Sequence, residues 1–265
     1  MAEKGILDIM SNPTVIPIAN LKKEPYATVL CYPRANDTEL QTRLSELQKH
    51  GVEAVEFTGK TTAFNVPVLG KGFVGIAVIA HLNKQRVALK IRRVDSGRQG
   101  LQNEAKMLAK ANSVNVAPIF ISASTNFLLM QFIDGDLLPS WLEMHKQKEQ
   151  VQSVLREVLE QCWRLDEAGL DHGELSKAPK HVIVNKAQHP FIVDFETASL
   201  NRKPANVTAI CQYLFVSKSA VARTTAEVLG GKNLNELVDT LRHYKRDRTH
   251  SNFERILQVC FTERT

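Results

Sequence analysis

The chain has 265 residues, of which 43% are hydrophobic and 23% charged, and its formal net charge is +6 with a pI of about 9.1. This composition is typical of a folded protein with one or two cores. No apolar run approaches the roughly 18 residues of a membrane span, and no secretion signal begins the sequence, so a cytoplasmic protein without membrane attachment is predicted. The four cysteines lie far apart and form no C-x-x-C pair, which argues against a zinc site and a disulfide framework.

The first 60 residues are predicted to form a small α/β extension. Apolar runs at 15–18, 27–32 and 53–57 predict strands, and leucines at helical spacing predict a helix over 38–50. Two interpretations are open. The extension either forms a separate module that recognises a partner or adds strands to the sheet that follows it, and we favour the second.

A glycine-rich segment comes next, in which Gly70, Gly72 and Gly75 form a G-x-G-x-x-G pattern. A dinucleotide-binding fingerprint requires a helix directly after the glycines and an acidic residue about 20 positions further on. Here the pattern predicts strands at 76–82 and 87–91 joined by a polar turn, and the residue at that distance is the cation Lys90. A glycine hairpin over phosphates with a lysine on the next strand is the arrangement of protein kinases. The alternative is a plain hairpin with turn glycines.

Residues 98–111 have the apolar spacing of a helix, and Glu104 lies within it. A lysine that contacts phosphates needs an anionic partner to fix its long side chain, and Glu104 is the candidate partner of Lys90. The alternative is a solvated glutamate on an amphipathic helix.

The segment that begins with His172, Gly173 and Glu174 resembles the H-G-D-L catalytic loop of small atypical kinases. Glutamate stands where that loop has aspartate, and a carboxylate can still orient or deprotonate an acceptor hydroxyl. His181 stands where the family has a metal-binding asparagine, after a longer spacing. Imidazole is a poorer ligand for Mg²⁺ than oxygen, so His181 is either a metal ligand or a structural residue.

A predicted strand at 191–193 ends at Asp194, which Phe195 and Glu196 follow. A carboxylate at this point can bring Mg²⁺ between the β- and γ-phosphates of ATP. Glu196 replaces the glycine of the D-F-G motif and adds a carboxylate that could contact the metal or a nearby cation. The alternative is a strand end with solvated acids.

Taken together, residues from about 64 to 200 resemble the protein-kinase-like superfamily. Within it the chain is most similar to the small atypical kinases of the RIO and KEOPS-associated type, and to an archaeal group of predicted Ser/Thr protein kinases. The resemblance implies an α+β, two-lobed fold with a β-rich N-lobe and a mainly helical, reduced C-lobe. We therefore expect three parts, an N-terminal extension at 1–60, an N-lobe at 61–133 and a C-lobe at 134–265.

The resemblance also implies ATP and Mg²⁺, or Mn²⁺, as cofactors, and it assigns roles to single residues. The strand at 127–133 would meet the adenine, and the alternative is a buried strand without a ligand. The expected catalytic residues are Glu174, Lys90 and Asp194, and the expected metal ligands are Asp194 and His181. The expected ATP-binding residues are Gly70, Lys71, Gly72, Gly75, Lys90, Glu104, Met130 and Phe132.

The leading functional hypothesis is therefore an ATP-dependent phosphotransferase that acts on Ser or Thr of a protein substrate. The substituted aspartate and asparagine positions leave open an ATP-binding pseudokinase or ATPase-like regulator, and H-G-D loops also occur in small-molecule kinases. No A-P-E motif follows Asp194, so control by phosphorylation of an activation loop is not expected. A basic stretch at 242–248 makes an RNA or ribosomal partner a minor prediction.

Overall fold

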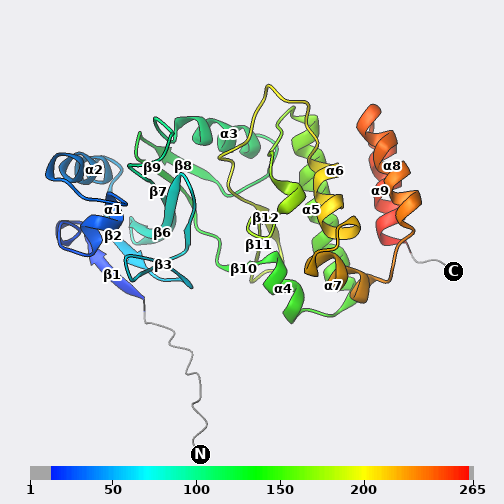
Figure 1. Ribbon diagram of the computed structural model, residues 1–265, viewed down its shortest axis with the longest axis horizontal. Coiled ribbons are helices and arrows are strands. Elements are labelled where there is room, and N and C mark those ends of the chain that lie inside the picture. The colour runs from blue at the N-terminus through cyan, green and yellow to red at the C-terminus, as the bar shows by residue number, and fades with distance from the viewer. Residues whose placement is uncertain (1–12, 263–265) are drawn as a thin grey trace, which may run out of the picture. The chain divides into compact units, whose positions relative to one another are not determined.

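The computed structural model describes residues 13–262, and the chain divides into two compact units. The first unit comprises the residues up to Gln102 together with Ile121–Phe132, and it is rich in strands. The second comprises Asn103–Phe120 together with the residues from Ile133 onward, and it is mainly helical (Figure 1). The predicted α+β class, with a β-rich part followed by a helical part, is confirmed.

The β-rich unit is built on a seven-stranded sheet in which neighbouring strands follow the order β1-β2-β6-β7-β9-β8, while β5 pairs with β6. The predicted strands at 15–18, 53–57, 76–82 and 87–91 all lie in this sheet. A separate hairpin consists of β3 (Thr61–Ala63) and β4 (Val66–Val68). The strands of the large sheet are β1 (Thr14–Pro17), β2 (Val52–Phe57), β5 (Gly70–Lys71), β6 (Gly75–Leu82), β7 (Gln85–Arg92), β8 (Phe120–Ala123) and β9 (Phe127–Gln131).

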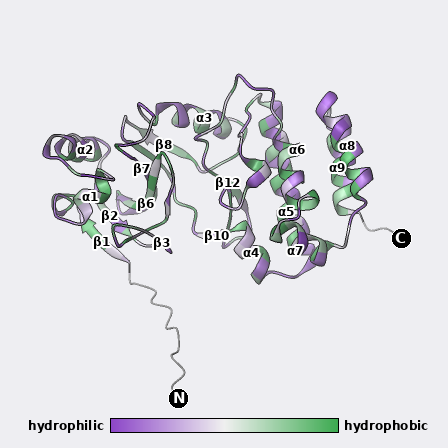
Figure 2. Ribbon diagram, viewed as in Figure 1, coloured by the Kyte–Doolittle hydropathy of each residue, from purple (hydrophilic) through white to green (hydrophobic). Residues whose placement is uncertain are grey.

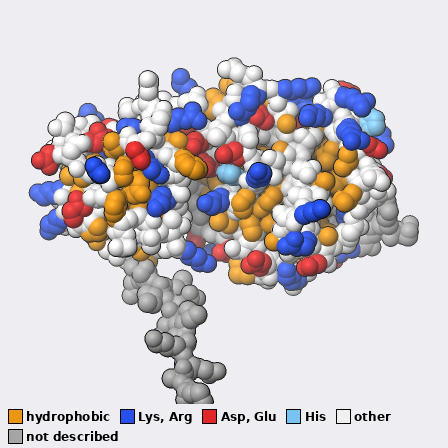
Figure 3. All heavy atoms as spheres, in the orientation of Figure 1, with side chains coloured by type: hydrophobic (Ala, Val, Ile, Leu, Met, Phe, Trp, Pro, Cys, Tyr) orange, Lys and Arg blue, Asp and Glu red, His pale blue; other side chains and the backbone are white. Residues whose placement is uncertain are grey.

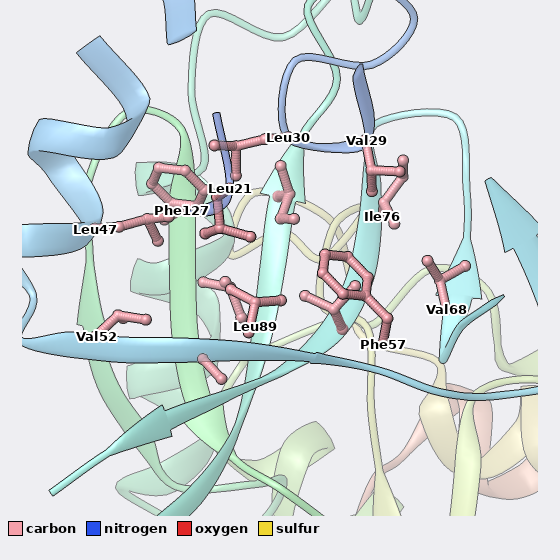
Figure 4. Packing of buried hydrophobic residues seen from close by; sticks show 14 of the residues in the cluster. Leu21, Val29, Leu30, Leu47, Val52, Phe57, Val68, Ile76, Leu89 and Phe127 are labelled. Atoms are coloured by element: carbon pink, nitrogen blue, oxygen red, sulfur yellow. The ribbon is translucent and has the colours of Figure 1, made fainter. Parts of the chain in front are cut away.

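The core of this unit lies on one face of the sheet. Because side chains alternate along a strand, Leu89 and Ile91 of β7 point into this core whereas Lys90 between them points to the opposite face. The helices α1 (Tyr26–Leu30) and α2 (Asp37–Lys49) contribute residues such as Leu30 and Leu47 to the same core (Figure 4). The N-terminal segment thus packs on the face away from Lys90.

The expectation of a strand at 27–32 is wrong, because these residues form α1 and the turn after it. Their β-branched and aromatic residues suggest a strand, but tertiary packing overrides this preference. As a helical turn, α1 places Ala27, Val29 and Leu30 together in the core. The helix predicted at 38–50 is confirmed as α2, and it starts one residue earlier because the Asn36 side chain accepts a hydrogen bond from Glu39 N at 2.9 Å.

The Arg43 side chain, fully buried, connects α2 to the sheet. Its guanidinium donates to the backbone oxygens of Leu30 and Arg92 at 2.7 and 2.6 Å, and to the side-chain oxygen of Asn126 at 3.1 Å. Together with the pairing of β1 and β2, this contact makes the N-terminal segment an extension of the large sheet. The division into an N-terminal extension at 1–60, an N-lobe at 61–133 and a C-lobe at 134–265 stays a prediction.

The helical unit is organised around α5 (Lys148–Glu167), whose apolar side is buried along its whole length. Figure 2 shows apolar residues along α5 and along the strands of the large sheet. A small sheet consists of β10 (Gly135–Leu137), β11 (Val182–Asn185) and β12 (Pro190–Ile192), in that order. The other helices are α3 (Gln102–Asn112), α4 (Leu138–Met144), α6 (Asn206–Cys211), α7 (Ala220–Leu229), α8 (Leu234–Arg246) and α9 (His250–Phe261).

Across residues 13–262, none of the helices combines the length and the apolar character that crossing a bilayer requires. The basic stretch at 242–248 begins within α8, where Arg242, Lys245 and Arg246 are exposed. Lys and Arg side chains gather on the surface around α8 in Figure 3. An RNA or ribosomal partner for this surface stays a prediction.

Candidate active site

The glycine-rich segment forms a tight hairpin between β5 and β6. Gly72 N donates to Gly75 O at 2.8 Å and closes the turn, which leaves Phe73 at its tip with 93% of its surface exposed. A Cβ on Gly75 would lie 2.8 Å from Ile91 O and 3.1 Å from Lys90 Cγ, so glycine is required there for the close approach of β6 and β7. A Cβ on Gly70 would meet no atom within 4 Å among the described residues. Packing among the described residues therefore does not require glycine at position 70.

Lys90 lies in the middle of the sheet, opposite Ala77 of β6 and Leu128 of β9. It is a buried residue, and its stem packs against Gly75. The structure thus places Lys90 beside the glycine hairpin, as the sequence predicts. Its contact with ATP and its pairing with Glu104, which belongs to the other unit, stay predictions.

The hairpin is also connected to the N-terminal segment through Tyr32. Arg93 donates to Gly72 O at 2.9 Å, and its guanidinium lies 4.8 Å from the centroid of the Tyr32 ring. The ammonium of Lys71 lies 5.5 Å from the same ring. These contacts fix the base of the hairpin to a residue outside the predicted kinase-like region.

The two residues expected near adenine occupy different positions at the end of β9. Met130 lies opposite Ala88 of β7 and is half-buried. Phe132 follows the strand, and the guanidinium of Arg86 stacks 4.7 Å from its ring centroid. Their role in binding adenine stays a prediction.

In the helical unit, the predicted catalytic loop turns sharply at Gly173, which has a φ of +91°. The left-handed conformation favours glycine, and a Cβ there would also crowd Thr197 Oγ1 at 3.0 Å and displace the Arg202 guanidinium, whose Nη2 would lie 2.5 Å away. Thr197 Oγ1 donates to His172 O at 2.9 Å. The loop then presents Glu174, whose side chain is 40% exposed and available to a bound molecule.

A buried hydrogen-bond network fixes the conformation of this loop. Asn206, at the start of α6, accepts from His172 N at 2.8 Å and donates to Leu170 O at 2.7 Å and Asp166 Oδ1 at 2.8 Å. Asp166 of α5 also accepts from the Tyr244 hydroxyl of α8 at 2.9 Å. Burial raises the pKa of Asp166, while its hydrogen bonds from the α6 amides and Tyr244 lower it.

Three carboxylates meet near the end of β12. One oxygen from each of Glu104, Asp194 and Glu196 lies within 4.8 Å of the others. Glu104 comes from α3 and is buried, whereas Asp194 sits at a left-handed backbone position with a φ of +69°. We call these residues the acidic cluster. Three carboxylate oxygens at this separation could act together as ligands of a cation.

His181 also lies close to Asp194. Its Nε2 atom is 3.5 Å from Glu174 Oε2 and 3.8 Å from Asp194 Oδ2, so the histidine lies between the expected catalytic carboxylate and the expected metal ligand. Its ring also contacts the ring of His172 edge-on at 5.4 Å. The structure brings these predicted residues together. It also places Glu104, which was not among the expected metal ligands, beside Asp194 and Glu196, the second of which was expected to contact either the metal or a nearby cation.

The acidic cluster fits Mg²⁺ better than the group formed by Glu174, His181 and Asp194. Mg²⁺ prefers oxygen ligands at about 2.1 Å, so two ligand oxygens on one ion lie roughly 3–4.2 Å apart. The oxygens of the acidic cluster, within 4.8 Å of one another, need to move by only a fraction of an ångström to share an ion. His181 offers nitrogen, which suits Mn²⁺ or Zn²⁺ better than Mg²⁺.

Comparison with known proteins shows a match to the RIO domain over residues 81–209. This region of the chain is therefore similar to the RIO domain. An uncharacterized protein of Methanocaldococcus jannaschii is 29% identical over 113 residues, which make up 43% of this chain and 90% of that protein. RIO domains are atypical protein-kinase-like domains that use ATP, generally with Mg²⁺, and the predicted resemblance to RIO-type kinases is confirmed.

The RIO match covers Lys90, Glu104, Glu174 and the acidic cluster, but not every part of the chain. The N-terminal segment, the β3–β4 hairpin and the glycine hairpin precede it, and α7, α8 and α9 follow it. The sheet nevertheless continues across the beginning of the match, because β2 pairs with β6. These flanking elements therefore lie outside the matched region, although the large sheet is continuous with it.

The buried side chain of His172 should make the free energy of unfolding depend on pH. Burial lowers its pKa from 6.5 to about 4. Between pH 6.5 and about 4, His172 is therefore protonated in the unfolded chain but neutral in the folded protein. The free energy of unfolding is thus highest above pH 6.5 and decreases as the pH falls toward 4. The expected slope is about 1.4 kcal/mol per pH unit. Urea unfolding at several pH values, in the presence of a chelator, should show this slope in the wild type and a reduced one in His172→Gln. Equal slopes would contradict the assignment.

Sequence reasoning missed Asp166, Asn206 and Tyr244, although two of them carry a signal. Asp166 occupies a core position of α5, next to Leu165, and a carboxylate at such a position needs partners. Tyr244 continues the apolar stripe of Leu237 and Leu241 through the basic stretch. Asn206 carries no such signal, because its partners come from distant parts of the chain.

Proposed function

We propose that this protein is an atypical Ser/Thr protein kinase that transfers the γ-phosphoryl group of ATP to a hydroxyl of a protein substrate in the cytoplasm. The observation that carries the proposal is the position of Asp194. It lies within the acidic cluster, and His181 places Glu174 beside it. The acidic cluster and an exposed carboxylate thus lie together within the region that matches the RIO domain, which supports the proposal.

Each residue has a defined task in the proposed reaction. Asp194, with Glu196 and Glu104, would hold Mg²⁺, which when bound neutralises charge on the phosphate oxygens. Glu174 accepts a hydrogen bond from the acceptor hydroxyl and takes its proton. As the hydroxyl oxygen bonds to the γ-phosphorus, the bond from that phosphorus to the β-γ bridging oxygen breaks and ADP leaves. Lys90 balances the charge of the remaining phosphates.

The test is incubation of the purified protein with γ-labelled ATP and Mg²⁺, followed by analysis of labelled amino acids. Label on Ser or Thr of the protein or of an added protein, lost in Lys90→Ala and Glu174→Gln, supports the proposal. Phosphate release without labelled protein indicates an ATPase instead, and ATP binding without turnover indicates a pseudokinase. Label confined to a small metabolite from a lysate indicates a small-molecule kinase. Each of these three results overturns the proposal.

A further inference from the structure

A second group of metal-ligating side chains adjoins the acidic cluster and differs from it in chemistry. It consists of Glu174, His181 and Asp194, and one ligand atom from each lies within 4.8 Å of the others. We call these residues the histidine cluster. It shares Asp194 with the acidic cluster, but it adds an imidazole and the carboxylate that accepts a proton in the proposed reaction. A cation bound to the histidine cluster would therefore act directly on Glu174.

The spacing of the histidine cluster suits a tetrahedral Zn²⁺ ion. Zn²⁺ binds imidazole nitrogen and carboxylate oxygen at about 2.0–2.2 Å, so two ligands of a tetrahedral ion lie about 3.3–3.5 Å apart. His181 Nε2 lies 3.5 Å from Glu174 Oε2 and 3.8 Å from Asp194 Oδ2. Both carboxylate side chains are 40% exposed, so rotation of these side chains can bring their oxygens closer together. One imidazole and two carboxylates leave the fourth position of the ion open to water.

The fold holds the imidazole of His181 in this position. Val193 N donates to His181 O at 3.0 Å, which fixes His181 beside the residue that precedes Asp194. The His181 side chain is only 13% exposed, and its ring meets the fully buried ring of His172 edge-on at 5.4 Å. The imidazole is therefore already ordered next to the carboxylates, which lowers the entropic cost of binding an ion.

The hydrogen-bonding atoms of the two rings are compatible with a cation on His181 Nε2. Within residues 13–262, the buried Nδ1 atoms of His172 and His181 have no hydrogen-bond partner. The neutral His172 ring donates from Nε2 to Val193 O at 3.0 Å, so its Nδ1 is a bare acceptor. A cation on Nε2 of His181 moves the proton of that ring to Nδ1, and His172 offers an acceptor in the neighbouring ring.

We propose that Glu174, His181 and Asp194 bind Zn²⁺ and that the bound ion inhibits the proposed phosphoryl transfer. The inhibition rests on the proposed function, because a carboxylate that binds Zn²⁺ loses the basicity needed to take the proton of the acceptor hydroxyl. The metal site itself does not rest on that function. Mg²⁺ competes weakly for the histidine cluster, because it prefers an all-oxygen site such as the acidic cluster.

The binding test is a titration of the whole protein with Zn²⁺ in excess Mg²⁺, followed by the nitrogen chemical shifts of the histidine rings. We expect one equivalent of Zn²⁺ to shift Nε2 of His181. His181→Asn and Glu174→Gln should each weaken Zn²⁺ binding by about tenfold or more. Because Glu174 is 40% exposed, Glu174→Gln should keep the fold and carries the test even if His181→Asn is unstable.

His250→Asn is the matched control for the titration. Its Nε2 lies 3.5 Å from Glu254 Oε1 on α9, so the wild type has a second, exposed histidine beside a carboxylate. A lone pair of this kind lacks the third ligand, and its loss should leave the affinity for Zn²⁺ unchanged. The proposal is overturned by absence of binding at about 0.1 mM Zn²⁺, or by an equal loss of affinity in His181→Asn and His250→Asn.

The inhibition is tested by the rate of label transfer from γ-labelled ATP and Mg²⁺, with free Zn²⁺ set by a metal buffer. Transfer should fall as the histidine cluster fills, and half-inhibition of His181→Asn should need about tenfold more Zn²⁺. A full rate with the site filled overturns the inhibition. Absence of transfer before Zn²⁺ is added overturns the proposed function, and with it the inhibition, while the titration decides the metal site separately.

Discussion

Replacing Asp194 by asparagine is expected to reduce phosphoryl transfer by about 10²–10³-fold without unfolding the protein. The substitution keeps the shape of the side chain and removes one of the three negative charges of the acidic cluster. Phosphoryl transfer depends mainly on positioning and charge neutralisation, so weaker metal binding acts directly on the transition state. The measurement is the initial rate of label transfer from γ-labelled ATP at saturating Mg²⁺.

Asp239→Asn is the matched control for this experiment. Asp239 lies exposed on α8, where its carboxylate pairs with Arg242 at 2.9 Å. A surface pair of this kind contributes little to stability, so the control should keep both the fold and the activity of the wild type. Activity of Asp194→Asn within about twofold of the wild type would show that the acidic cluster does not hold the metal.

Replacing Asn206 by alanine is expected to lower the free energy of unfolding by about 4 kcal/mol. The side chain is buried and joins three groups, so its removal leaves His172 N, Leu170 O and one hydrogen-bonding position of Asp166 without a partner. Each unsatisfied buried group costs about 1–3 kcal/mol. The measurement is urea unfolding followed by far-ultraviolet circular dichroism.

Two further variants provide reference values for this loss in the free energy of unfolding. Tyr244→Phe removes only the hydroxyl that donates to Asp166 and should cost about 1.5–3 kcal/mol. Asn235→Ala, at an exposed position of α8, should change stability by less than about 0.5 kcal/mol. A loss below about 1 kcal/mol in Asn206→Ala would mean that water or a rearranged loop replaces its hydrogen bonds.

The strands around the glycine hairpin could be predicted from the sequence because their pattern is local. Alternating apolar residues and a polar turn suffice to define β6 and β7, and Lys90 follows from its place on the second strand. The segment that forms α1 could not be predicted in the same way. Its residues suit a strand, and only burial against the large sheet makes a helical turn more favourable.

In the candidate site, too, the local features could be predicted from the sequence, whereas the features that depend on tertiary packing could not. The positions of Glu174 and Asp194 at the ends of predicted elements are local features, and the sequence identifies both. The approach of Glu104 to Glu196 depends on how α3 lies in the helical unit, so the sequence pattern does not contain it. The support that Asn206 gives to His172 joins residues 34 positions apart and was missed for the same reason.

The most direct test of the central claim, that the acidic cluster holds Mg²⁺ with ATP, is calorimetric titration of the wild type with ATP. One titration contains Mg²⁺ and the other a chelator. We predict saturable binding in Mg²⁺ that weakens by about tenfold or more in the chelator, because a bound Mg²⁺ would link the carboxylate oxygens of the acidic cluster to the phosphate oxygens of ATP. ATP binding of equal affinity in both titrations, or no binding in either, would contradict this account.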